Sequence, residues 1–301
     1  MMEKRCAILS MDSLEDFHAY DHLIEPYLAE LGWQTETISW RAQNVNWSDF
    51  DAVIIRTPWD YQDDAAAFIQ VLEQIEASSA HLENAIEIVR WNIDKIYLQQ
   101  LEQQGVSVVP TRWFDKLDDK LLTAEQLDIM FEQLNRDQIV LKPRISANSD
   151  NTFWLHRSTA AQKLAVLNSA FAQRHFMAQP FMDSVIAEGE FSLFYFNGEY
   201  SHAILKTPKK QDFRVQEEHG GQLQSIEPEA ELVKQANWCI EQIASIHTMP
   251  LYARVDFVRY QESFALMEAE LIEPSLYFNM DEQSPKRFAQ ALVAKMKQLT
   301  L

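Results

Sequence analysis

Two segments near the C-terminus decide how the chain is interpreted: Leu251-Tyr-Ala-Arg-Val-Asp-Phe-Val258 and Leu266-Met-Glu-Ala-Glu-Leu-Ile-Glu-Pro274. Both segments are largely apolar, and a polar stretch from Arg259 to Ser263 separates them. Two apolar runs joined by a short polar turn predict a β-hairpin. We therefore expect two neighbouring antiparallel strands near the end of the chain.

Charged side chains alternate with apolar ones along this hairpin. Successive side chains point to opposite faces of a strand, so Arg254 and Asp256 share a face of the first strand. Glu268 and Glu270 share a face of the second strand for the same reason. Mg²⁺ prefers oxygen ligands, commonly one or two carboxylates together with substrate phosphates. A half-solvated surface strand is the alternative, but the apolar flanks favour a metal site.

The composition is that of an ordinary globular protein with an acidic surface. The 301 residues are 47% apolar and 24% charged, and the net charge is −19. Nucleic acids need a basic surface, so we expect no nucleic-acid partner. The sequence holds no apolar run of about 18 residues and no signal peptide, so we expect no membrane partner. The two cysteines, Cys6 and Cys239, lack metal-ligand spacing and are expected to be buried thiols in the cytoplasm.

The N-terminal part reads as a small α/β lobe. The pattern predicts a strand at Arg5–Ser10, a helix at Asp16–Leu31 that ends at Gly32, and a strand at Asp51–Arg56 that is buried on both faces. Ligands bind such lobes at the carboxyl ends of the strands. The side chains that follow the last of these strands are therefore candidate substrate contacts: Arg56, Trp59, Asp60 and Tyr61. Trp59 and Tyr61 read equally well as core or interface aromatics.

The middle of the chain adds two lysines and a second hairpin to these features. Asn92 is expected to cap a helix that reaches Gln104, and this helix carries Lys95. Lys142 ends an apolar strand just before a proline. Glu190–Phe196 and Glu199–Thr207 form a second hairpin around an Asn-Gly turn. Taken alone, a lysine at a strand end is explained by solvation.

The ordered set of motifs resembles the ATP-grasp superfamily, closest to the branch that contains glutathione synthetase and the D-cycloserine-forming cyclo-ligase. The motifs are Asn-Ile-Asp-Lys95, Val-Leu-Lys-Pro143, Met-Ala-Gln-Pro180, Glu-Gly-Glu190, Ala-Arg-Val-Asp256 and Glu-Ala-Glu-Leu-Ile-Glu-Pro274. The resemblance covers roughly residues 88–275. It implies an α/β fold with α+β lobes that enclose ATP: an N-terminal open α/β lobe (1–88), a central lid lobe (89–178) and a C-terminal lobe with the metal site (179–301).

The resemblance also implies roles for individual residues. The ATP contacts would be Lys95, Lys142, Ser146 and Ser149 for the phosphates, Gln179, Pro180, Phe181 and Met182 for adenine, and Glu190 for the ribose. Asp256, Glu268 and Glu270 would hold one or two Mg²⁺ ions, which Mn²⁺ can replace. Arg254, with Lys206 and Arg214 as further candidates, would neutralise the anionic reaction centre, and Glu273 and Ser275 would lie near the substrate.

The activity implied is ATP-dependent ligation of a small carboxylate to an amine. ATP converts the carboxylate to an acyl phosphate, and the amine then displaces phosphate. The substrates would be amino-acid-like or peptide-like. Three alternatives stay open: ring closure within one substrate, phosphotransfer to a hydroxyl without ligation, and a non-catalytic nucleotide-binding module. A homodimer is the family-level expectation.

One segment departs from the family pattern. The loop after Lys142 is usually glycine-rich and folds over the phosphates, yet residues 145–152 contain no glycine. Asn and Asp tolerate left-handed backbone better than most residues. Asn148, Asp150 and Asn151 are therefore expected to take the place of glycine.

Overall fold

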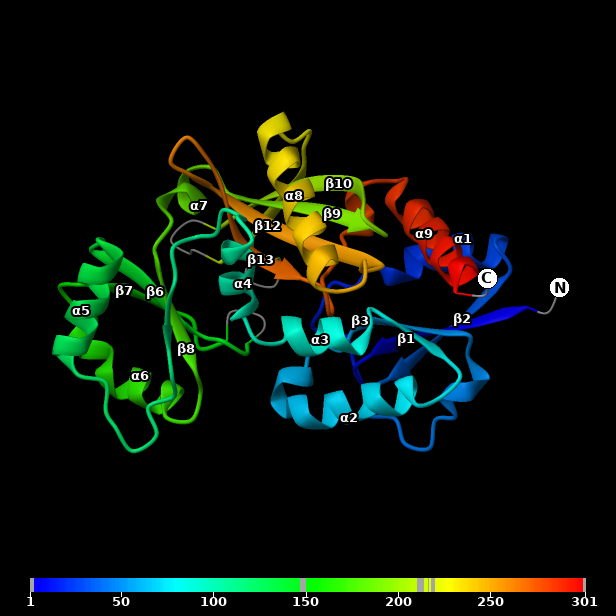
Figure 1. Ribbon diagram of the computed structural model, residues 1–301, viewed down its shortest axis with the longest axis horizontal. Helices are drawn as coiled ribbons and strands as arrows, with labels where there is room; N and C mark the ends of the chain where they lie inside the picture. The colour runs from blue at the N-terminus through cyan, green and yellow to red at the C-terminus, as the bar shows by residue number, and fades with distance from the viewer. Residues whose placement is uncertain (1–2, 147–149, 210–213, 216, 218–219, 300–301) are drawn as a thin grey trace.

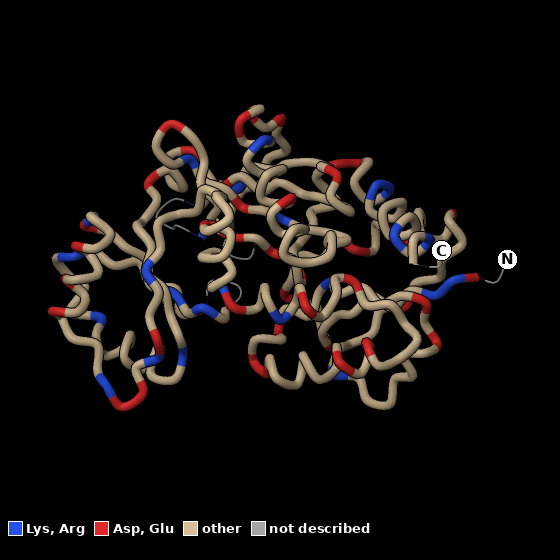
Figure 2. The backbone as a smooth tube through the Cα atoms, in the orientation of Figure 1, with Lys and Arg blue, Asp and Glu red and all other residues tan. Residues whose placement is uncertain are grey.

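The structure is a computed structural model that describes residues 3–146, 150–209, 214–215, 217 and 220–299. Its sheets form three lobes, of which the one with α5 and α6 projects to one side (Figure 1). The predicted fold, an open N-terminal α/β lobe with two α+β lobes, is confirmed, and the sheets of the two α+β lobes are antiparallel. No helix in the described residues is long and apolar enough to cross a membrane. Acidic positions occur in every lobe (Figure 2).

The N-terminal lobe is a parallel sheet covered on both faces. Its strands lie in the order β2-β1-β3-β4, with the bounds β1 Lys4–Ser10, β2 Trp33–Ser39, β3 Ala52–Thr57 and β4 His81–Glu83. Alternation on β1 sends Ala7 and Leu9 toward α2 (Ala65–Glu76) and α3 (Ile86–Asn92). Cys6 and Ile8 pack on the other side with α1 (Glu25–Glu30) and α9 (Ser284–Gln298). Every residue of β3 is buried, as predicted for this strand.

The lid lobe is an antiparallel sheet with helices on one face. The order is β5-β8-β6-β7, with the bounds β5 Arg112–Phe114, β6 Gln138–Pro143, β7 Phe153–His156 and β8 Phe176–Pro180. Ile139 and Leu141 pack against α5 (Ala124–Leu134) and α6 (Leu164–Phe171). Because side chains alternate along β6, Val140 and Lys142 face the opposite way, toward the C-terminal lobe.

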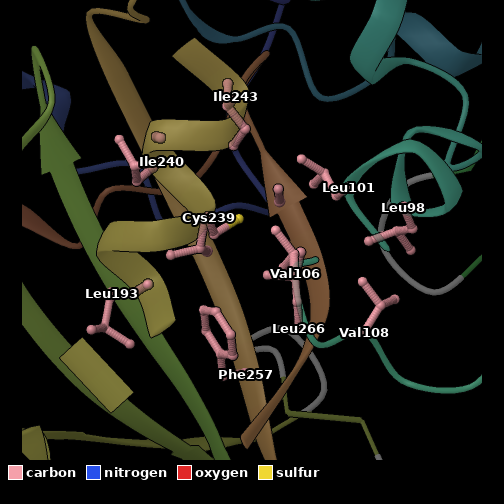
Figure 3. Close-up of a cluster of buried hydrophobic side chains, with 14 of the residues drawn as sticks. Leu98, Leu101, Val106, Val108, Leu193, Cys239, Ile240, Ile243, Phe257 and Leu266 are labelled. Atoms are coloured by element: carbon pink, nitrogen blue, oxygen red, sulfur yellow. The ribbon is translucent and has the colours of Figure 1, made fainter. Parts of the chain in front are cut away.

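The C-terminal lobe is built on five antiparallel strands in the order β11-β10-β9-β12-β13. The bounds are α7 Asp183–Ala187, β9 Glu190–Phe196, β10 Glu199–Thr207, β11 Gln222–Ser225, α8 Ala230–Ile246, β12 Tyr252–Tyr260 and β13 Ser263–Glu270. Both predicted hairpins are confirmed, as β9–β10 and β12–β13. Leu98 and Leu101 of α4 (Tyr97–Gln103) pack against α8 and β13 in this lobe's core (Figure 3). The lobe boundaries at residues 88 and 178 remain predictions. Although α4 falls within the range predicted for the lid lobe, it does not pack on the lid sheet.

Two predicted helices differ from the structure. The helix expected at Asp16–Leu31 is reduced to a short 3₁₀ turn and α1, which begins at Glu25 with a proline in its first turn. Proline has no N–H and clashes with the preceding turn, so a helix begins there and does not pass through it. The helix expected from Asn92 is split, since α3 ends at Asn92 and α4 begins at Tyr97.

The reason for the second difference lies in the Asn92 side chain. It donates to the Ala269 carbonyl at 2.8 Å and accepts from the Leu271 N–H at 2.9 Å. Tyr97 accepts from the Ala269 N–H at 2.9 Å. The edge of β13 is therefore bound by side chains of α3 and α4, and Asn92 supports this strand in place of capping a helix.

Candidate active site

The predicted site residues converge on one cavity between the lobes. Of the predicted residues, those that line it are Trp59, Tyr61, Lys95, Lys142, Ser146, Gln179, Pro180, Phe181, Met182, Glu190, Lys206, Arg214, Arg254, Asp256, Glu268, Glu270, Glu273 and Ser275. Ser149 lies outside the described residues. Arg56 and Asp60 do not line the cavity and are treated below.

The β12–β13 hairpin supplies the floor of the cavity. Arg254 lies directly opposite Glu270, and Asp256 lies directly opposite Glu268. The register then shifts, so that Phe257 pairs with Leu266 and Met267 is the extra residue of a β-bulge. A bulge leaves one residue unpaired and bends its strand. Met267 and Glu268 consequently both line the cavity, although they are adjacent in the sequence.

A compact network of charges occupies this floor. Arg254 Nη2 lies 3.1 Å from Asp256 Oδ2 and also contacts the Glu270 carboxylate. Lys206 Nζ lies 3.4 Å from Asp256 and 2.6 Å from Glu190. Burial alone would raise the pKa of Asp256, but Arg254 and Lys206 outweigh it and hold the pKa below its usual value. Asp256 is therefore ionised.

Glu270 is electrostatically different from Asp256. Burial raises its pKa to about 7, and the neighbouring carboxylates of Asp256 and Glu268 add to the rise, although Arg254 opposes it. Like charges that lie close together disfavour ionisation. This part of the floor is thus crowded with negative charge that an added cation would relieve.

Two lysines face the hairpin from the other side. Lys95 Nζ lies 3.1 Å from Glu268 and donates to the Ser146 carbonyl at 2.7 Å. Burial would raise the pKa of Glu268, but Lys95 and Lys142 lower it overall. Burial lowers the pKa of Lys142, which Glu268 partly offsets. Both lysines are therefore placed to meet an anion that enters between the lid and the hairpin.

Apolar side chains form the remaining walls near the lid. Phe181 stacks on Trp154 with ring centroids 4.1 Å apart, and Gln179 donates to the Thr111 hydroxyl at 3.0 Å. Val140 and Met267 line the same cavity and were missed from the sequence. Alternation along β6 pointed to Val140, whereas Met267 depends on the bulge.

Arg56 lies outside the cavity, which corrects its predicted contact with substrate. It is fully buried, its Nε donates to Asp21 at 2.5 Å, and its Nη2 donates to the Pro274 carbonyl at 2.8 Å. The guanidinium also lies 4.8 Å from the Tyr252 ring centroid. Asp21 supplies the acidic partner that a buried guanidinium needs.

Asp60 is also directed away from the cavity. It accepts from the Trp40 indole at 2.7 Å and pairs with Arg41 at 2.9 Å. Both partners follow β2. Asp60 therefore connects two loops of the N-terminal lobe. The structure does not bring it into the cavity, which corrects its predicted contact with substrate.

The segment after β13 is held by its carbonyl groups. The Tyr252 hydroxyl lies 2.5 Å from the Ile55 carbonyl and 3.0 Å from the Ile272 carbonyl, and Trp59 donates to the Glu273 carbonyl at 2.8 Å. Arg56 donates to the Pro274 carbonyl, and Arg254 donates to the Ser275 carbonyl at 3.2 Å. Four successive carbonyls are thus bound by side chains, which fixes where the side chains of Glu273 and Ser275 lie.

The carboxylate oxygens of the hairpin are ligands of the kind that Mg²⁺ prefers. Among the described residues no three His, Cys, Asp or Glu side chains are already grouped as a metal site. Asp256 and Glu268 nevertheless lie opposite each other on paired strands, and both have lowered pKa values. Mg²⁺ is commonly bound by one or two carboxylates with phosphate oxygens and water completing its shell. Two ionised carboxylates facing the lysines meet that requirement.

Sequence comparison matches two segments of the chain to known protein families. Residues 6–84 match the N-terminal domain of D-cycloserine synthetase DcsG, and residues 108–247 match the ATP-grasp domain of prokaryotic glutathione synthetase. The cycloserine biosynthesis protein DcsG of Streptomyces lavendulae is 30% identical in an alignment 280 residues long, and the match covers 89% of this chain and 90% of that protein.

Structural comparison agrees with these matches. The crystal structure of D-cycloserine synthetase DcsG has a TM-score of 0.85 at 27% identity, and the match covers 97% of this chain and 99% of that one. D-Alanine–D-alanine ligase from Bacillus anthracis complexed with ATP has a TM-score of 0.68 at 13% identity, with 98% of each chain covered, and this likeness bears on the fold alone. The chain belongs to the ATP-grasp superfamily of carbon–nitrogen ligases, with a glutathione synthetase-type ATP-grasp domain and a close relation to D-cycloserine synthetase DcsG.

Proposed function

We propose that this ligase forms an amide-type bond on a small amino-acid- or peptide-like carboxylate through an acyl phosphate, with release of ADP and phosphate. One observation carries the proposal above all. Arg254, Lys206 and the paired carboxylates Asp256 and Glu268 face the same cavity as Lys95 and Lys142. Cations on both sides of a carboxylate pair suit the transfer of a phosphoryl group, which depends on positioning and charge neutralisation.

The proposed reaction has two steps. The substrate carboxylate attacks the γ-phosphorus of ATP, the bond to ADP breaks, and an acyl phosphate forms. The amine then attacks the acyl carbon, phosphate leaves with the bonding electron pair, and the amine loses a proton. Lys95 and Lys142 would hold the ATP phosphates, and Arg254 would neutralise charge that develops at the acyl centre. The described part of the active site offers no Ser-His-Asp set, and this chemistry needs none.

With the phosphates at Lys95 and Lys142, the other parts of ATP are proposed to occupy the rest of the cavity. Adenine would lie between the lid strands and Met267, against Phe181 and Met182, with Glu190 near the ribose. Asp256, Glu268 and Glu270 would hold one or two Mg²⁺ ions, which supply positive charge at the phosphates. Arg214 and Ser146 are proposed as further contacts to the anionic groups, and Ser275 as a substrate contact. We place the enzyme in the cytoplasm, and leave the homodimer as a family-level expectation.

Ring closure within one substrate is the second candidate. It is supported by the match of residues 6–84 to the N-terminal domain of D-cycloserine synthetase DcsG. The N-terminal lobe contributes Trp59 and Tyr61 to the cavity, so its similarity bears on the substrate. Intermolecular ligation requires room for two substrates, whereas cyclisation requires room for one.

The test is an assay for ADP and phosphate with hydroxylamine as the amine. A panel of amino acids and dipeptides is supplied with MgATP, and an acid that becomes an acyl phosphate is trapped as its hydroxamate. Hydroxamate formation that depends on both ATP and Mg²⁺ supports the ligase. A stable phosphorylated alcohol without free phosphate would instead favour a phosphotransferase. An acid that releases phosphate without any added amine, and yields a cyclic product, would favour ring closure.

A further inference from the structure

One end of the cavity is an aromatic chamber contributed mainly by the N-terminal lobe. Phe17, Trp59 and Tyr61 line it together with Ile272. Phe17 and Trp59 have ring centroids 5.4 Å apart, and Trp59 and Tyr61 are largely buried. None of these side chains contacts a phosphate in the proposed arrangement, because Lys95 and Lys142 lie on the lid side of the hairpin. The chamber is therefore available to the acid substrate.

The Glu273 carboxylate belongs to this part of the cavity and is carried by the fixed segment after β13. The Glu273 carbonyl accepts from the Trp59 indole at 2.8 Å, and its side chain hydrogen-bonds to Tyr61. The neighbouring carbonyls of Ile272 and Pro274 are bound by Tyr252 and Arg56. The backbone on each side of Glu273 is thus fixed, so the position of its carboxylate is set before any ligand arrives.

Glu273 differs from the other cavity carboxylates in its partners. Four other acids of the cavity each pair with a cationic side chain: Glu190 and Asp256 with Lys206, Glu268 with Lys95, and Glu270 with Arg254. Within the described residues, no Lys, Arg or His side chain forms an ion pair with Glu273, although it lines the same cavity. A carboxylate among apolar groups is costly unless it is paired. Its surroundings therefore suit a cation that the protein itself does not supply.

Aromatic walls strengthen the preference for such a cation. The faces of Trp and Tyr rings attract ammonium groups, and this attraction grows as water is excluded. We propose that Glu273, Trp59 and Tyr61 bind the ammonium group of the substrate acid, so that the acid activated is a free amino acid and not an N-acylated or peptide acid. This inference rests on the proposed function, since it places the reacting carboxylate beside Arg254 in the same cavity.

The geometry gives this subsite a defined task. A zwitterion would span the cavity with its carboxylate at the cationic centre and its ammonium group at Glu273. An acid without a free amino group would lose the second contact and would leave Glu273 unpaired. Discrimination against such acids is expected because a site with buried polar groups rejects a ligand that cannot satisfy them.

The test uses matched acids and one isosteric variant. Each amino acid of the panel is compared with its N-acetyl derivative in the ATP- and hydroxylamine-dependent assay. The free amino acid is expected to give a kcat/KM about 10- to 100-fold higher, the loss that follows removal of a charged hydrogen-bond partner. Glu273→Gln is expected to raise the KM for the amino acid by a similar factor, to leave the KM for ATP unchanged, and to reduce the preference. Asp63→Asn is the matched control, since Asp63 is exposed in the same lobe.

A second measurement separates this inference from the proposed function. Calorimetry measures the binding of the same acid pairs without ATP, so it does not depend on turnover. Binding of a free amino acid that weakens in Glu273→Gln supports the subsite even where no acid forms a hydroxamate, an outcome that would defeat the ligase proposal alone. Equal use or equal binding of the N-acetyl acids overturns the subsite. The subsite is also overturned if Glu273→Gln impairs the free amino acid and its N-acetyl derivative equally.

Discussion

The Nζ atom of Lys206 lies 2.6 Å from the carboxylate of Glu190, on the neighbouring strand of the C-terminal sheet. Asp256 lies 3.4 Å from the same ammonium group. Burial lowers the pKa of Lys206, but these two carboxylates outweigh it and raise the pKa well above its usual value. One cation therefore pairs with both the acid proposed to bind the ribose and an acid proposed to bind the metal.

Lys206→Met tests this double role. Methionine keeps most of the volume but removes the charge, so two buried carboxylates lose their shared partner. Breaking a buried ion pair by removal of one partner costs about 3–5 kcal/mol. We expect a loss of that size in the free energy of unfolding measured with urea, and a loss of ADP release. Lys234→Met on α8 is the control, because its side chain is 78% exposed. Unchanged stability of Lys206→Met would contradict the arrangement.

Asp256→Asn tests the metal assignment. The amide keeps the shape of the carboxylate but carries no negative charge for Mg²⁺. We expect ADP release to fall by at least about 100-fold, comparable to the removal of an electrostatic group at a reaction centre, while circular dichroism shows the fold intact. Glu268→Gln should behave alike.

The control for these carboxylates is Glu262→Gln at the tip of the same hairpin, where the side chain is exposed. It should retain normal ADP release. Normal ADP release in Asp256→Asn or Glu268→Gln would remove these residues from the metal site.

Arg56→Met tests whether this arginine is structural. The substitution leaves Asp21 without its buried partner and the Pro274 carbonyl without its donor. We expect the free energy of unfolding to fall by about 3–5 kcal/mol, with the KM for ATP unchanged in the folded enzyme. Arg5→Met, an exposed pair with Glu36, is the control. A raised KM for the acid substrate at normal stability would return Arg56 to the substrate site.

The hairpin and its charged face were predictable because both depend on local pattern. Strand alternation predicts that Arg254 and Asp256 share a face of β12 and that Glu268 and Glu270 share a face of β13, and the register places the two pairs opposite each other. The buried strand β3 was predictable for a similar reason, since a short apolar run is typical of a parallel strand covered on both faces.

The roles of other residues depend on contacts far apart in the sequence. Arg56 binds a carbonyl 218 residues away, and Asn92 binds Ala269 across 177 residues. No local pattern distinguishes such a side chain from one that faces a ligand or caps a helix. The bulge at Met267 is likewise set by strand pairing, so alternation along the strand could not indicate that Met267 lines the same cavity as Glu268.

The last prediction concerns how stability depends on pH at Glu273. Burial raises the pKa of Glu273 to about 8, and the nearby charge of Glu270 adds to the rise. Glu268 acts in the same direction, whereas Lys95 and the hydrogen bond from Tyr61 oppose it. The folded protein therefore binds a proton here that the unfolded chain releases near its ordinary value of 4.5. Stability falls with pH wherever the native state holds more protons than the unfolded state.

The contribution of Glu273 is thus fully present below about pH 4.5 and is lost as the pH rises through about 8. Glu273→Gln carries no titrating group and resembles the protonated acid. We expect the melting temperatures of the two proteins to be similar at pH 5, and the variant to become progressively more stable than the parent up to about pH 8, beyond which the difference levels off. The comparison is made by thermal melting without ATP or Mg²⁺. Saturation with an amino acid that binds at Glu273 should remove the difference at high pH, because the ammonium group stabilises the ionised carboxylate of the parent alone. A difference that is constant across this range would mean that Glu273 is ionised throughout.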